Sequence, residues 1–374
     1  MQYSSEDVKY MKMALRYAAK GIGKVEPNPA VGCLITKSNQ IIGKGFHQKF
    51  GQAHAEINAL DDCKNLGVKP IGSTMYVTLE PCCHYGKTGP CTEAIINAGV
   101  ARVIVATLDT SPHASGAGIE KLKQAGIEVS VGLCQLEANL LNAGFLKHAK
   151  TKRPWVILKW AQSIDGKLAW VDGSAQRWIS NEQSRADSHN LRRSCTAIIV
   201  GVNTVIKDNP LLTPRPAKGK SPLRIVLDNN LRIPLGSRIL NTKDKTMIVS
   251  TARAVDAQPE KAERIRAKDV EILTVPEIDG NCYVEAILDE LGKRDIQQIL
   301  VEGGPTVINS FLKSAQADEA VIYIAGKMLG KNGDVDIETA MIGIPEPMEL
   351  FHMSVQHFEN DCRIKGTIRD MNFF

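Results

Sequence analysis

His54-Ala55-Glu56 and, further along, Pro81-Cys82-Cys83-His84-Tyr85-Gly86-Lys87-Thr88-Gly89-Pro90-Cys91 are the segments that decide how this chain folds. The imidazole of His54 and the thiols of Cys82 and Cys91 give a zinc ion three ligands and leave its fourth tetrahedral position open. An open position is typical of catalytic zinc, since structural zinc is closed by four protein ligands. Glu56 then remains available to move protons. The segments predict a catalytic zinc site with ligands His54, Cys82 and Cys91 and with Glu56 as general acid and base.

The residues around these segments alternate between strand and helix patterns. A strand is expected over 74–79, which delivers Cys82, and helices over 53–62 and 91–98 place His54 and Cys91 near helix starts. The other elements expected in this half are a helix after a capping box at Ser4 and Asp7, a hairpin of 30–36 with 41–46, and strands over 102–106 and 128–131. This alternation predicts an α/β sandwich with a largely parallel sheet.

A polar stretch, 148–154, interrupts the pattern, and the alternation of strands and helices then restarts. Further strands are expected over 155–160, 197–200, 223–227, 246–250, 298–301 and 320–324, and further helices over 181–194 and 284–291. At 374 residues the chain exceeds the size at which one hydrophobic core usually stops growing. We therefore predict two different domains, residues 1–146 and 147–374.

Composition limits the function classes. The net charge is +5 and the basic residues form no long block, so charge does not indicate a nucleic-acid partner. No apolar run reaches the eighteen or so residues of a membrane-spanning helix, and the polar N-terminus lacks a secretory signal. Nine cysteines, an odd number, favour a reduced chain. The expectation is a cytoplasmic protein with no membrane partner, whose mild positive charge suits phosphorylated small molecules.

The motifs of the first half carry a family resemblance. His-x-Glu followed by Pro-Cys and a second Cys matches the signature of zinc deaminases. The stretches 27–32, 45–47, 54–56 and 78–82 resemble the bifunctional deaminase–reductases of the riboflavin pathway. Eight residues separate Cys82 from Cys91, which is similar to that branch, whereas other deaminases normally have Cys-x-x-Cys. The resemblance implies a cytidine-deaminase-like three-layer α/β/α domain. It also implies that Asn28 is a ring or ribose contact, although a turn residue is an equal alternative.

The second half lacks a Gly-x-Gly-x-x-Gly motif after a strand, which argues against a Rossmann dinucleotide site. It contains Gln298-Ile299-Leu300-Val301-Glu302-Gly303-Gly304-Pro305-Thr306 instead, an apolar strand followed by a glycine turn and a proline suited to a helix start. Such a turn is either only a tight connection or, through its free N–H groups, a phosphate site.

The stretches 159–167, 178–180, 201–204 and 208–213 resemble the reductase domain of the same family, which has a dihydrofolate-reductase-like α/β fold. The resemblance implies NADPH contacts at Gln162, Trp178, Thr204, Asp208, Gly304, Pro305, Thr306, Val307, Ile308, Asn309 and Ser310. It implies substrate contacts at Gln176, Arg192, Leu212, Arg215 and Glu302. The two arginines suit a ribose 5′-phosphate. Asp165 and Glu302 are candidate proton donors, and a homo-oligomer through the reductase domain is expected.

Together these features predict an enzyme of riboflavin biosynthesis that uses Zn²⁺ and NADPH. It would hydrolyse the 2-amino group of 2,5-diamino-6-(5-phosphoribosylamino)pyrimidin-4(3H)-one and then reduce the ribosyl chain to give 5-amino-6-(5-phosphoribitylamino)uracil. One alternative is a zinc base deaminase that acts on tRNA, with the second half as a binding module; the mild charge and the absent Cys-x-x-Cys count against it. Another is a non-catalytic protein with a structural zinc, which requires a fourth ligand such as His84. Cys83 is assigned to packing.

Overall fold

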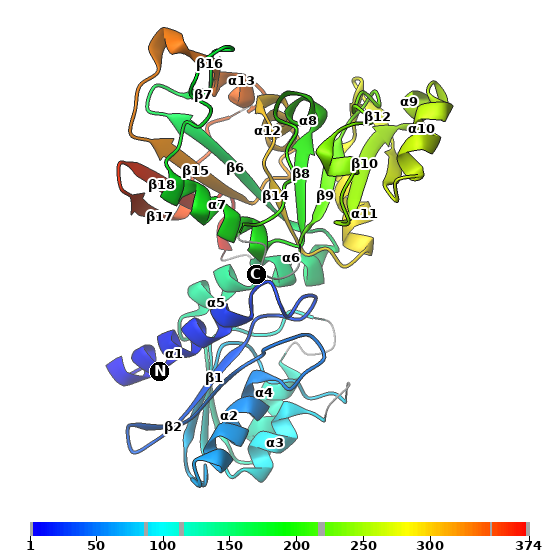
Figure 1. The fold of residues 1–374 in the computed structure, drawn as a ribbon. Helices are drawn as coiled ribbons and strands as arrows, with labels where there is room; N and C mark the ends of the chain where they lie inside the picture. The colour runs from blue at the N-terminus through cyan, green and yellow to red at the C-terminus, as the bar shows by residue number, and fades with distance from the viewer. Residues whose placement is uncertain (1–2, 86–88, 112–115, 216–220, 345, 372–374) are drawn as a thin grey trace. The chain divides into compact units, whose positions relative to one another are not determined.

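The chain forms two compact units, one of Met1–Lys152 with Met371–Phe374 and one of Arg153–Asp370. The computed structural model describes residues 3–85, 89–111, 116–215, 221–344 and 346–371 (Figure 1). The domain boundary expected after residue 146 lies inside a helix, α6 (Ala143–Thr151). Each unit has a sheet of its own.

The first unit contains a five-stranded sheet with helices between the strands. Its strands are β1 (Gly32–Lys37), β2 (Gln40–Phe46), β3 (Thr74–Val77), β4 (Arg102–Val105) and β5 (Glu128–Val131). Its helices are α1 (Ser5–Ala18), α2 (Ala55–Asn65), α3 (Cys91–Asn97), α4 (Ala117–Gln124), α5 (Gln135–Leu141) and α6. The sheet order is β2-β1-β3-β4-β5, and only β3, β4 and β5 run parallel.

The antiparallel part of this sheet is the hairpin of β1 and β2. Ser38 and Asn39 join the two strands with φ values of 50° and 60°. Two consecutive left-handed residues form the kind of tight turn whose twist matches that of paired strands. Since β1 is antiparallel to both β2 and β3, the expectation of a largely parallel sheet holds for β3–β5 alone.

Helices cover both faces of the first sheet. One hydrophobic cluster joins Ile35 and Val103 of the sheet to α2, α3 and α4 through residues such as Ala59, Ile95 and Leu122. A second cluster, which includes Met11, Leu34 and Ala138, joins the opposite face to α1 and α5. This arrangement is the predicted three-layer α/β/α sandwich (Figure 1).

The capping box predicted at the first helix is present. The amide of Asp7 donates to Ser4 Oγ, and the amide of Ser4 donates to Asp7 Oδ2, both at 3.0 Å. The same Asp7 is buried and accepts a 2.8 Å hydrogen bond from the hydroxyl of Tyr76. The cap therefore also fastens α1 to β3.

The second unit is built on a nine-stranded sheet of order β11-β10-β9-β8-β14-β6-β15-β18-β17. These strands are β6 (Trp155–Ser163), β8 (Ala197–Gly201), β9 (Leu223–Leu227), β10 (Thr246–Thr251), β11 (Glu271–Val275), β14 (Gln298–Val301), β15 (Glu319–Ala325), β17 (Phe351–Phe358) and β18 (Asp361–Thr367). Two small ladders pair β7 (Lys167–Trp170) with β16 (Gly333–Asp336) and β12 (Glu277–Ile278) with β13 (Asn281–Cys282). The seven strands from β11 to β15 are parallel, and the last two are antiparallel.

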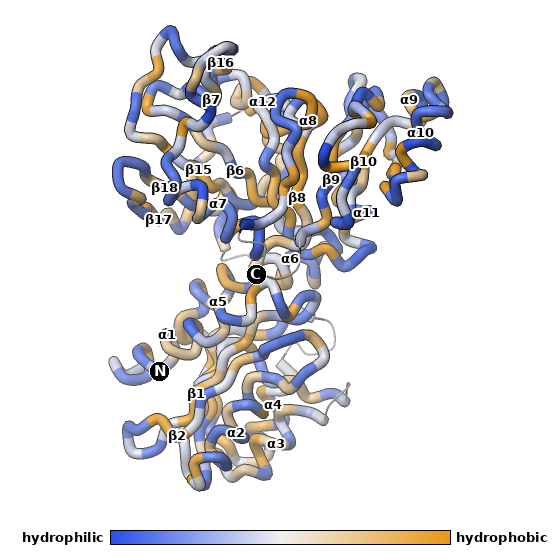
Figure 2. The backbone as a smooth tube through the Cα atoms, in the orientation of Figure 1, coloured by the Kyte–Doolittle hydropathy of each residue, from blue (hydrophilic) through white to orange (hydrophobic). Residues whose placement is uncertain are grey.

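Helices connect these strands and cover the sheet. They are α7 (Glu182–Ser194), α8 (Val202–Asp208), α9 (Ala252–Asp256), α10 (Pro259–Arg266), α11 (Val284–Lys293), α12 (Pro305–Lys313) and α13 (Glu338–Met341). The main core packs strand residues such as Ile199 and Val301 against Leu288 of α11 and Phe311 of α12. Figure 2 shows the strongly hydrophobic run along β8. In the described ranges, no helix combines the length and the apolar character needed to cross a membrane.

Candidate active site

The three predicted zinc ligands lie together in the first unit. His54 is the residue that precedes α2, Cys91 is the first residue of α3, and Cys82 lies in the segment after β3. Their ligand atoms all lie within 4.8 Å of one another. His54 Nδ1 is 3.6 Å from the sulfur of Cys82 and 3.3 Å from that of Cys91.

These distances fit a single tetrahedral zinc ion. Zinc–nitrogen and zinc–sulfur bonds of about 2.1 and 2.3 Å at a tetrahedral angle separate two ligand atoms by roughly 3.6 Å. The observed separations of 3.6 and 3.3 Å from His54 to the two sulfurs are close to this value. His54, Cys82 and Cys91 can therefore hold zinc with little rearrangement, and a fourth position remains for a non-protein ligand.

The local electrostatics favour a thiolate in this cluster. Hydrogen bonds from Cys91 and His54 lower the pKa of the Cys82 thiol, against the effect of burial. The amide of Cys91, at the start of α3, also donates to the Cys82 sulfur at 3.4 Å. The contact with Cys82 in turn raises the pKa of His54. A thiolate is the form that binds a metal.

Glu56 lies in the first turn of α2, one residue beyond the helix start at Ala55, and is 3% exposed. Burial raises the pKa of its carboxyl group to about 7. A carboxyl group with a pKa near neutrality can both accept and donate a proton, which suits a general acid and base. Glu56 is not part of the three-residue group that could bind a metal.

Cys83 and His84 take no part in this metal cluster. His84 is exposed and Cys83 is partly buried. Among the described residues, the groups able to hold a metal ion comprise His54, Cys82 and Cys91 alone. Among the residues that the structure describes, the structural-zinc alternative therefore lacks the fourth protein ligand that it requires.

Two residues without a predicted role also support this site. Nδ1 of the buried His47 lies 3.1 Å from the carbonyl oxygen of Ala53, and its ring meets the ring of His54 edge to face at 5.4 Å. Nε2 of His47 lies 3.2 Å from the side-chain nitrogen of Asn28. His47 thus connects Asn28, the predicted ring or ribose contact, to the backbone that carries His54.

Glu80 is the second such residue. Its buried carboxylate accepts hydrogen bonds from the amides of Gly116, Gly118 and Asp109 at 3.0, 2.9 and 3.3 Å. Only Pro81 separates Glu80 from Cys82, so Glu80 joins the ligand segment to the region around the start of α4. The local sequence Leu-Glu-Pro-Cys does not indicate these partners of Glu80, because they lie 29 to 38 residues further along the chain.

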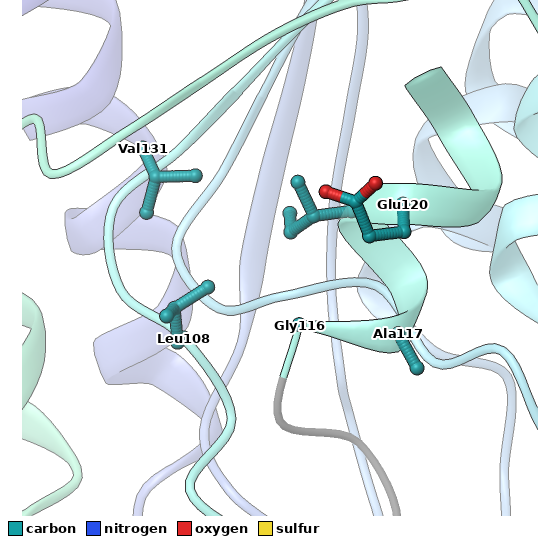
Figure 3. Close-up of a pocket in the computed structure, with 6 residues that line it drawn as sticks. Leu108, Gly116, Ala117, Glu120 and Val131 are labelled. Carbon is teal, nitrogen blue, oxygen red and sulfur yellow. The ribbon is translucent and has the colours of Figure 1, made fainter. Parts of the chain in front are cut away.

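An open hollow of about 520 Å³ lies at the carboxyl ends of β4 and β5 (Figure 3). The six lining residues are Leu108, Gly116, Ala117, Ile119, Glu120 and Val131. None of them is a predicted zinc ligand or Glu56. The hollow is thus lined by other residues than those of the metal cluster.

A second cluster of charged side chains lies in the second unit. Arg192 Nε and Nη2 donate to the two oxygens of Glu302 at 2.8 and 2.7 Å, and Lys159 Nζ is 3.9 Å from Glu302. All three side chains are largely buried. Burial favours a raised pKa for Glu302, but Arg192 and Lys159 outweigh it and lower the pKa to about 2. The cluster joins two predicted substrate contacts, Arg192 and Glu302, to Lys159, for which no role was predicted.

His189 extends this cluster by one helical turn from Arg192. Burial, together with the positive charges of Arg192 and Arg215, lowers its pKa. Its Nδ1 atom is buried and has no hydrogen-bond partner in the described part of the protein. The predicted substrate contact Arg215 thus acts electrostatically on the same group as Arg192.

The other predicted reductase residues lie mainly at the carboxyl ends of neighbouring strands. Gln162 is near the end of β6, and Thr204 and Asp208 lie in α8, directly after β8. Gly304 caps α12, and the helix starts at Pro305, as the Gly-Pro sequence predicts. Because β8, β14 and β6 are parallel neighbours, these residues share one edge of the sheet. Ligands of open α/β sheets bind at this edge.

The glycine turn before α12 is closely packed. A Cβ atom on Gly303 would lie 2.4 Å from Val307, and one on Gly201 would lie 2.8 Å from the same side chain. The first turn of α12 therefore sits tightly against the end of β8. In this turn Pro305 has no N–H group, and the amides of Val307 and Ile308 donate to the carbonyl oxygen of Gly304 at 3.0 and 3.2 Å.

Trp178 and Gln176 lie on the segment before α7 and are exposed, Trp178 to 54%. The guanidinium groups of Arg177 and Arg185 lie 5.0 and 5.4 Å from the centre of the Trp178 ring. Leu212 differs from both, since it is buried and has a φ of 57°. The structure thus places Trp178 in a cationic setting that the sequence motif alone did not indicate.

Comparison with known proteins bears on both units. Residues 4–107 match the family described as the cytidine and deoxycytidylate deaminase zinc-binding region, and residues 154–362 match the RibD C-terminal domain. The chain is 44% identical over 363 residues to the riboflavin biosynthesis protein RibD of Aquifex aeolicus, with 96% of this chain and 97% of that protein covered. This chain belongs to the RibD family.

Two further RibD proteins agree with this assignment. RibD of Escherichia coli (strain K12) is 40% identical over 340 residues, which cover 87% of this chain and 89% of that one. A solved structure from Thermotoga maritima, a diaminohydroxyphosphoribosylaminopyrimidine deaminase/5-amino-6-(5-phosphoribosylamino)uracil reductase, has a TM-score of 0.82 and 34% identity and covers 97% of this chain and 98% of its own.

Membership of the RibD family confirms several predictions from the sequence. The chain is a bifunctional enzyme, a deaminase and reductase of riboflavin biosynthesis, with a cytidine-deaminase-like first domain and a RibD reductase second domain. The zinc-binding deaminase region supports Zn²⁺, and the reductase domain implies a nicotinamide cofactor. The tRNA deaminase alternative is less well supported.

Proposed function

We propose that this chain catalyses two consecutive steps on one phosphorylated pyrimidine. The first is hydrolysis of the 2-amino group of 2,5-diamino-6-(5-phosphoribosylamino)pyrimidin-4(3H)-one, and the second is reduction of the ribosyl chain by NADPH to give 5-amino-6-(5-phosphoribitylamino)uracil. The observation that carries the proposal is the grouping of His54, Cys82 and Cys91 within 4.8 Å, with the buried Glu56 two residues from His54.

In the deamination step, His54, Cys82 and Cys91 hold the metal and Glu56 moves protons. When bound, zinc lowers the pKa of a water molecule to about 7. Glu56, whose own pKa is about 7, takes a proton from the water and returns one to the departing amine. Asn28, oriented by His47, contacts the substrate ring or ribose.

In the reduction step, the carboxyl edge of the second sheet binds cofactor and substrate. We assign the cofactor contacts to Gln162, Trp178, Thr204, Asp208 and the residues from Gly304 to Ser310, and the substrate contacts to Gln176, Arg192, Leu212, Arg215 and Glu302. Since Glu302 occupies the Nε–Nη2 edge of Arg192, that arginine meets a phosphate through its Nη1 side, and Arg215 provides the second guanidinium. When bound, NADPH supplies the hydride for the ribosyl carbon.

Neither of the two candidate proton donors, Asp165 and Glu302, suits this step. Asp165 accepts hydrogen bonds from Ser163 Oγ at 2.6 Å and the Gly330 amide at 2.7 Å, and these hold its pKa well below the ordinary range. Asp165 and Glu302 are thus both ionised at neutral pH. Burial lowers the pKa of Lys159, which lies beside Glu302. We therefore assign to Lys159 the proton that the ribosyl ring oxygen gains as the ring opens.

We further infer that the protein self-associates through the reductase domain. β17 is the edge strand of the nine-stranded sheet, and it exposes Phe351, Met353 and Val355 to 38%, 61% and 53%. Monomeric proteins seldom leave an apolar edge strand open, because it is a template for pairing with another chain. A second copy that pairs along β17 would cover these side chains.

The role of Glu56 provides the direct test of the first step. We expect Glu56→Gln to slow ammonia release from the diamino substrate by about 10²- to 10⁴-fold, because a group that transfers protons typically contributes that much to a rate. Zinc content, measured by elemental analysis, should equal that of the wild type. Ammonia release at the wild-type rate by the zinc-loaded variant would overturn the assignment.

A further inference from the structure

The histidine of helix α7, His189, has no role in the two reactions proposed above. Its side chain is partly buried, and its Nδ1 atom is buried without a hydrogen-bond partner among the described residues. A buried polar atom without a partner is rare in folded proteins, and it calls for an explanation such as a catalytic role or a bound ion or water molecule. The charges around His189 decide which ligand this atom can accept.

Helix α7 places His189 beside Arg192. Residues three apart lie on one face of a helix, so the two side chains are neighbours. The side chain of Arg192 is 18% exposed and donates two hydrogen bonds to Glu302. Lys159 Nζ lies 3.9 Å from the same carboxylate. His189 therefore adjoins the charged cluster to which substrate contacts are assigned.

Burial lowers the pKa of the His189 imidazole below its ordinary value, and most of the charges around it act in the same direction. Arg192 of the same helix, Arg215 of the segment before β9 and Lys159 of β6 disfavour a positive imidazole. Glu302, directly after β14, favours it. Three positive groups thus stand against one negative group. The imidazole is neutral at pH 7 in the free protein, within a cluster whose total charge is positive.

A bound phosphate would reverse the electrostatic effect on His189. A phosphate monoester carries nearly two negative charges above pH 7, because its second pKa is about 6. The proposed function assigns that phosphate to Arg192 and Arg215, the two guanidinium groups that act on His189. An anion at these arginines raises the pKa of a nearby imidazole, since an opposite charge favours the protonated form. The anion also offers an oxygen acceptor to Nδ1.

We propose that His189 is a third contact for the 5′-phosphate of the reductase substrate and that it takes up one proton from solvent when the phosphate binds. The inference rests on the proposed function in one respect, the placement of the phosphate at Arg192 and Arg215. Before binding, the imidazole carries one N–H group. After binding, both ring nitrogens carry a proton, and Nδ1 donates to a phosphate oxygen. His189 thus makes substrate affinity depend on pH and takes no part in hydride transfer.

Isothermal titration calorimetry of the zinc-loaded, full-length protein measures this proton directly. The ligand is the reduction product, 5-amino-6-(5-phosphoribitylamino)uracil, which carries the same phosphate and cannot accept a hydride. Titrations at about pH 7.5 in two buffers with different enthalpies of ionisation give the number of protons taken up on binding. We expect the wild type to take up between about 0.5 and 1 proton, because the bound imidazole has the higher pKa.

Two variants separate a titrating contact from a structural role. His189→Asn keeps an N–H donor near the position of Nδ1 and cannot titrate, so we expect it to bind the product without proton uptake. His189→Leu removes the donor, and its dissociation constant at about pH 7 should rise about 10- to 100-fold, because a hydrogen bond to a charged group is lost. The wild-type constant should rise with pH as the bound imidazole loses its proton, and both variants should lack this rise.

The outcomes separate this proposal from the proposed function. An Arg215→Met variant that binds the product as tightly as the wild type would contradict the placement of the phosphate, which the proposed function requires. Weaker binding by Arg215→Met, together with wild-type binding that takes up no proton, would overturn the role of His189 alone. Equal proton uptake by the wild type and by His189→Asn would overturn it as well, since another group would then be the one that titrates.

Discussion

At the scale of single residues, the sequence indicates which side chains lie together where the chemistry is contained in short motifs. His54, Cys82 and Cys91 were predicted from residue type and spacing, and the structure brings their ligand atoms within 4.8 Å. Lys159 received no role, because its partner Glu302 lies far along the chain and is reached only through the pairing of β6 with β14. Contacts formed by strand pairing have no local sequence signal.

The adjacent cysteines offer a matched test of the metal site. We expect Cys82→Ser to lose bound zinc and ammonia release together, because serine is a poor replacement for a thiolate ligand. Cys83→Ser makes the same replacement of sulfur by oxygen at the neighbouring position. This variant should keep a full equivalent of zinc. Elemental analysis of both purified variants provides the comparison. Zinc loss from Cys83→Ser alone would reverse the assignment of the two cysteines.

At the scale of elements, the sequence patterns predicted most of the strands and helices that hold the sites, but not α8, which carries Thr204 and Asp208. The capping box at Ser4 and the helix start at Pro305 are present as expected. Helix α10 and the strands β17 and β18 were not predicted. β17 is exposed at most of its positions, so its sequence does not show the alternation of apolar and polar residues that predicts a strand. Tertiary pairing with β18, not local pattern, makes β17 a strand.

Arg224 shows how a buried side chain can fix a segment of the reductase site. It is fully buried in β9, and its guanidinium donates to the carbonyl oxygens of Leu211 at 3.1 Å and Asp244 at 2.6 Å. Leu211 directly precedes Leu212, and Arg215 follows three residues later. Arg224 is therefore a positioning residue for the segment that carries two proposed substrate contacts.

We expect Arg224→Met to destabilise the protein by about 2–4 kcal/mol, because several buried carbonyl groups lose their donor. At temperatures where the variant stays folded, the Michaelis constant of the reductase should rise several-fold while ammonia release is unchanged. Steady-state kinetics of the two reactions on the same preparation provide the measurement. An unchanged Michaelis constant would mean that Arg224 serves stability alone.

At the scale of the whole molecule, the two units have different folds and separate hydrophobic cores. Chain length and the polar interruption at 148–154 predicted a two-domain chain, because 374 residues exceed a single core. The first unit contains all of the predicted zinc ligands, and the second contains all of the predicted cofactor contacts. We therefore expect each activity to survive the loss of the other.

Self-association belongs to this scale as well. We expect Val355→Lys, on the exposed edge strand β17, to reduce the molar mass measured by light scattering after size exclusion, because a buried lysine would oppose pairing of the strands. Ile71→Lys, at a position of the first unit that is 58% exposed, is the matched control and should leave the mass unchanged. A wild type that is monomeric at all concentrations would contradict the proposed association.

The claim that one chain performs two ordered steps at separate sites can be tested in one assay. Purified protein is mixed with the diamino-pyrimidinone ribotide without a nicotinamide cofactor, ammonia is measured, and NADPH is then added while its absorbance at 340 nm is followed. We expect one equivalent of ammonia before NADPH is present and then the oxidation of about one equivalent of NADPH with no further ammonia. Oxidation of NADPH by a Glu56→Gln variant that has released no ammonia, or ammonia release that requires NADPH, would contradict the account.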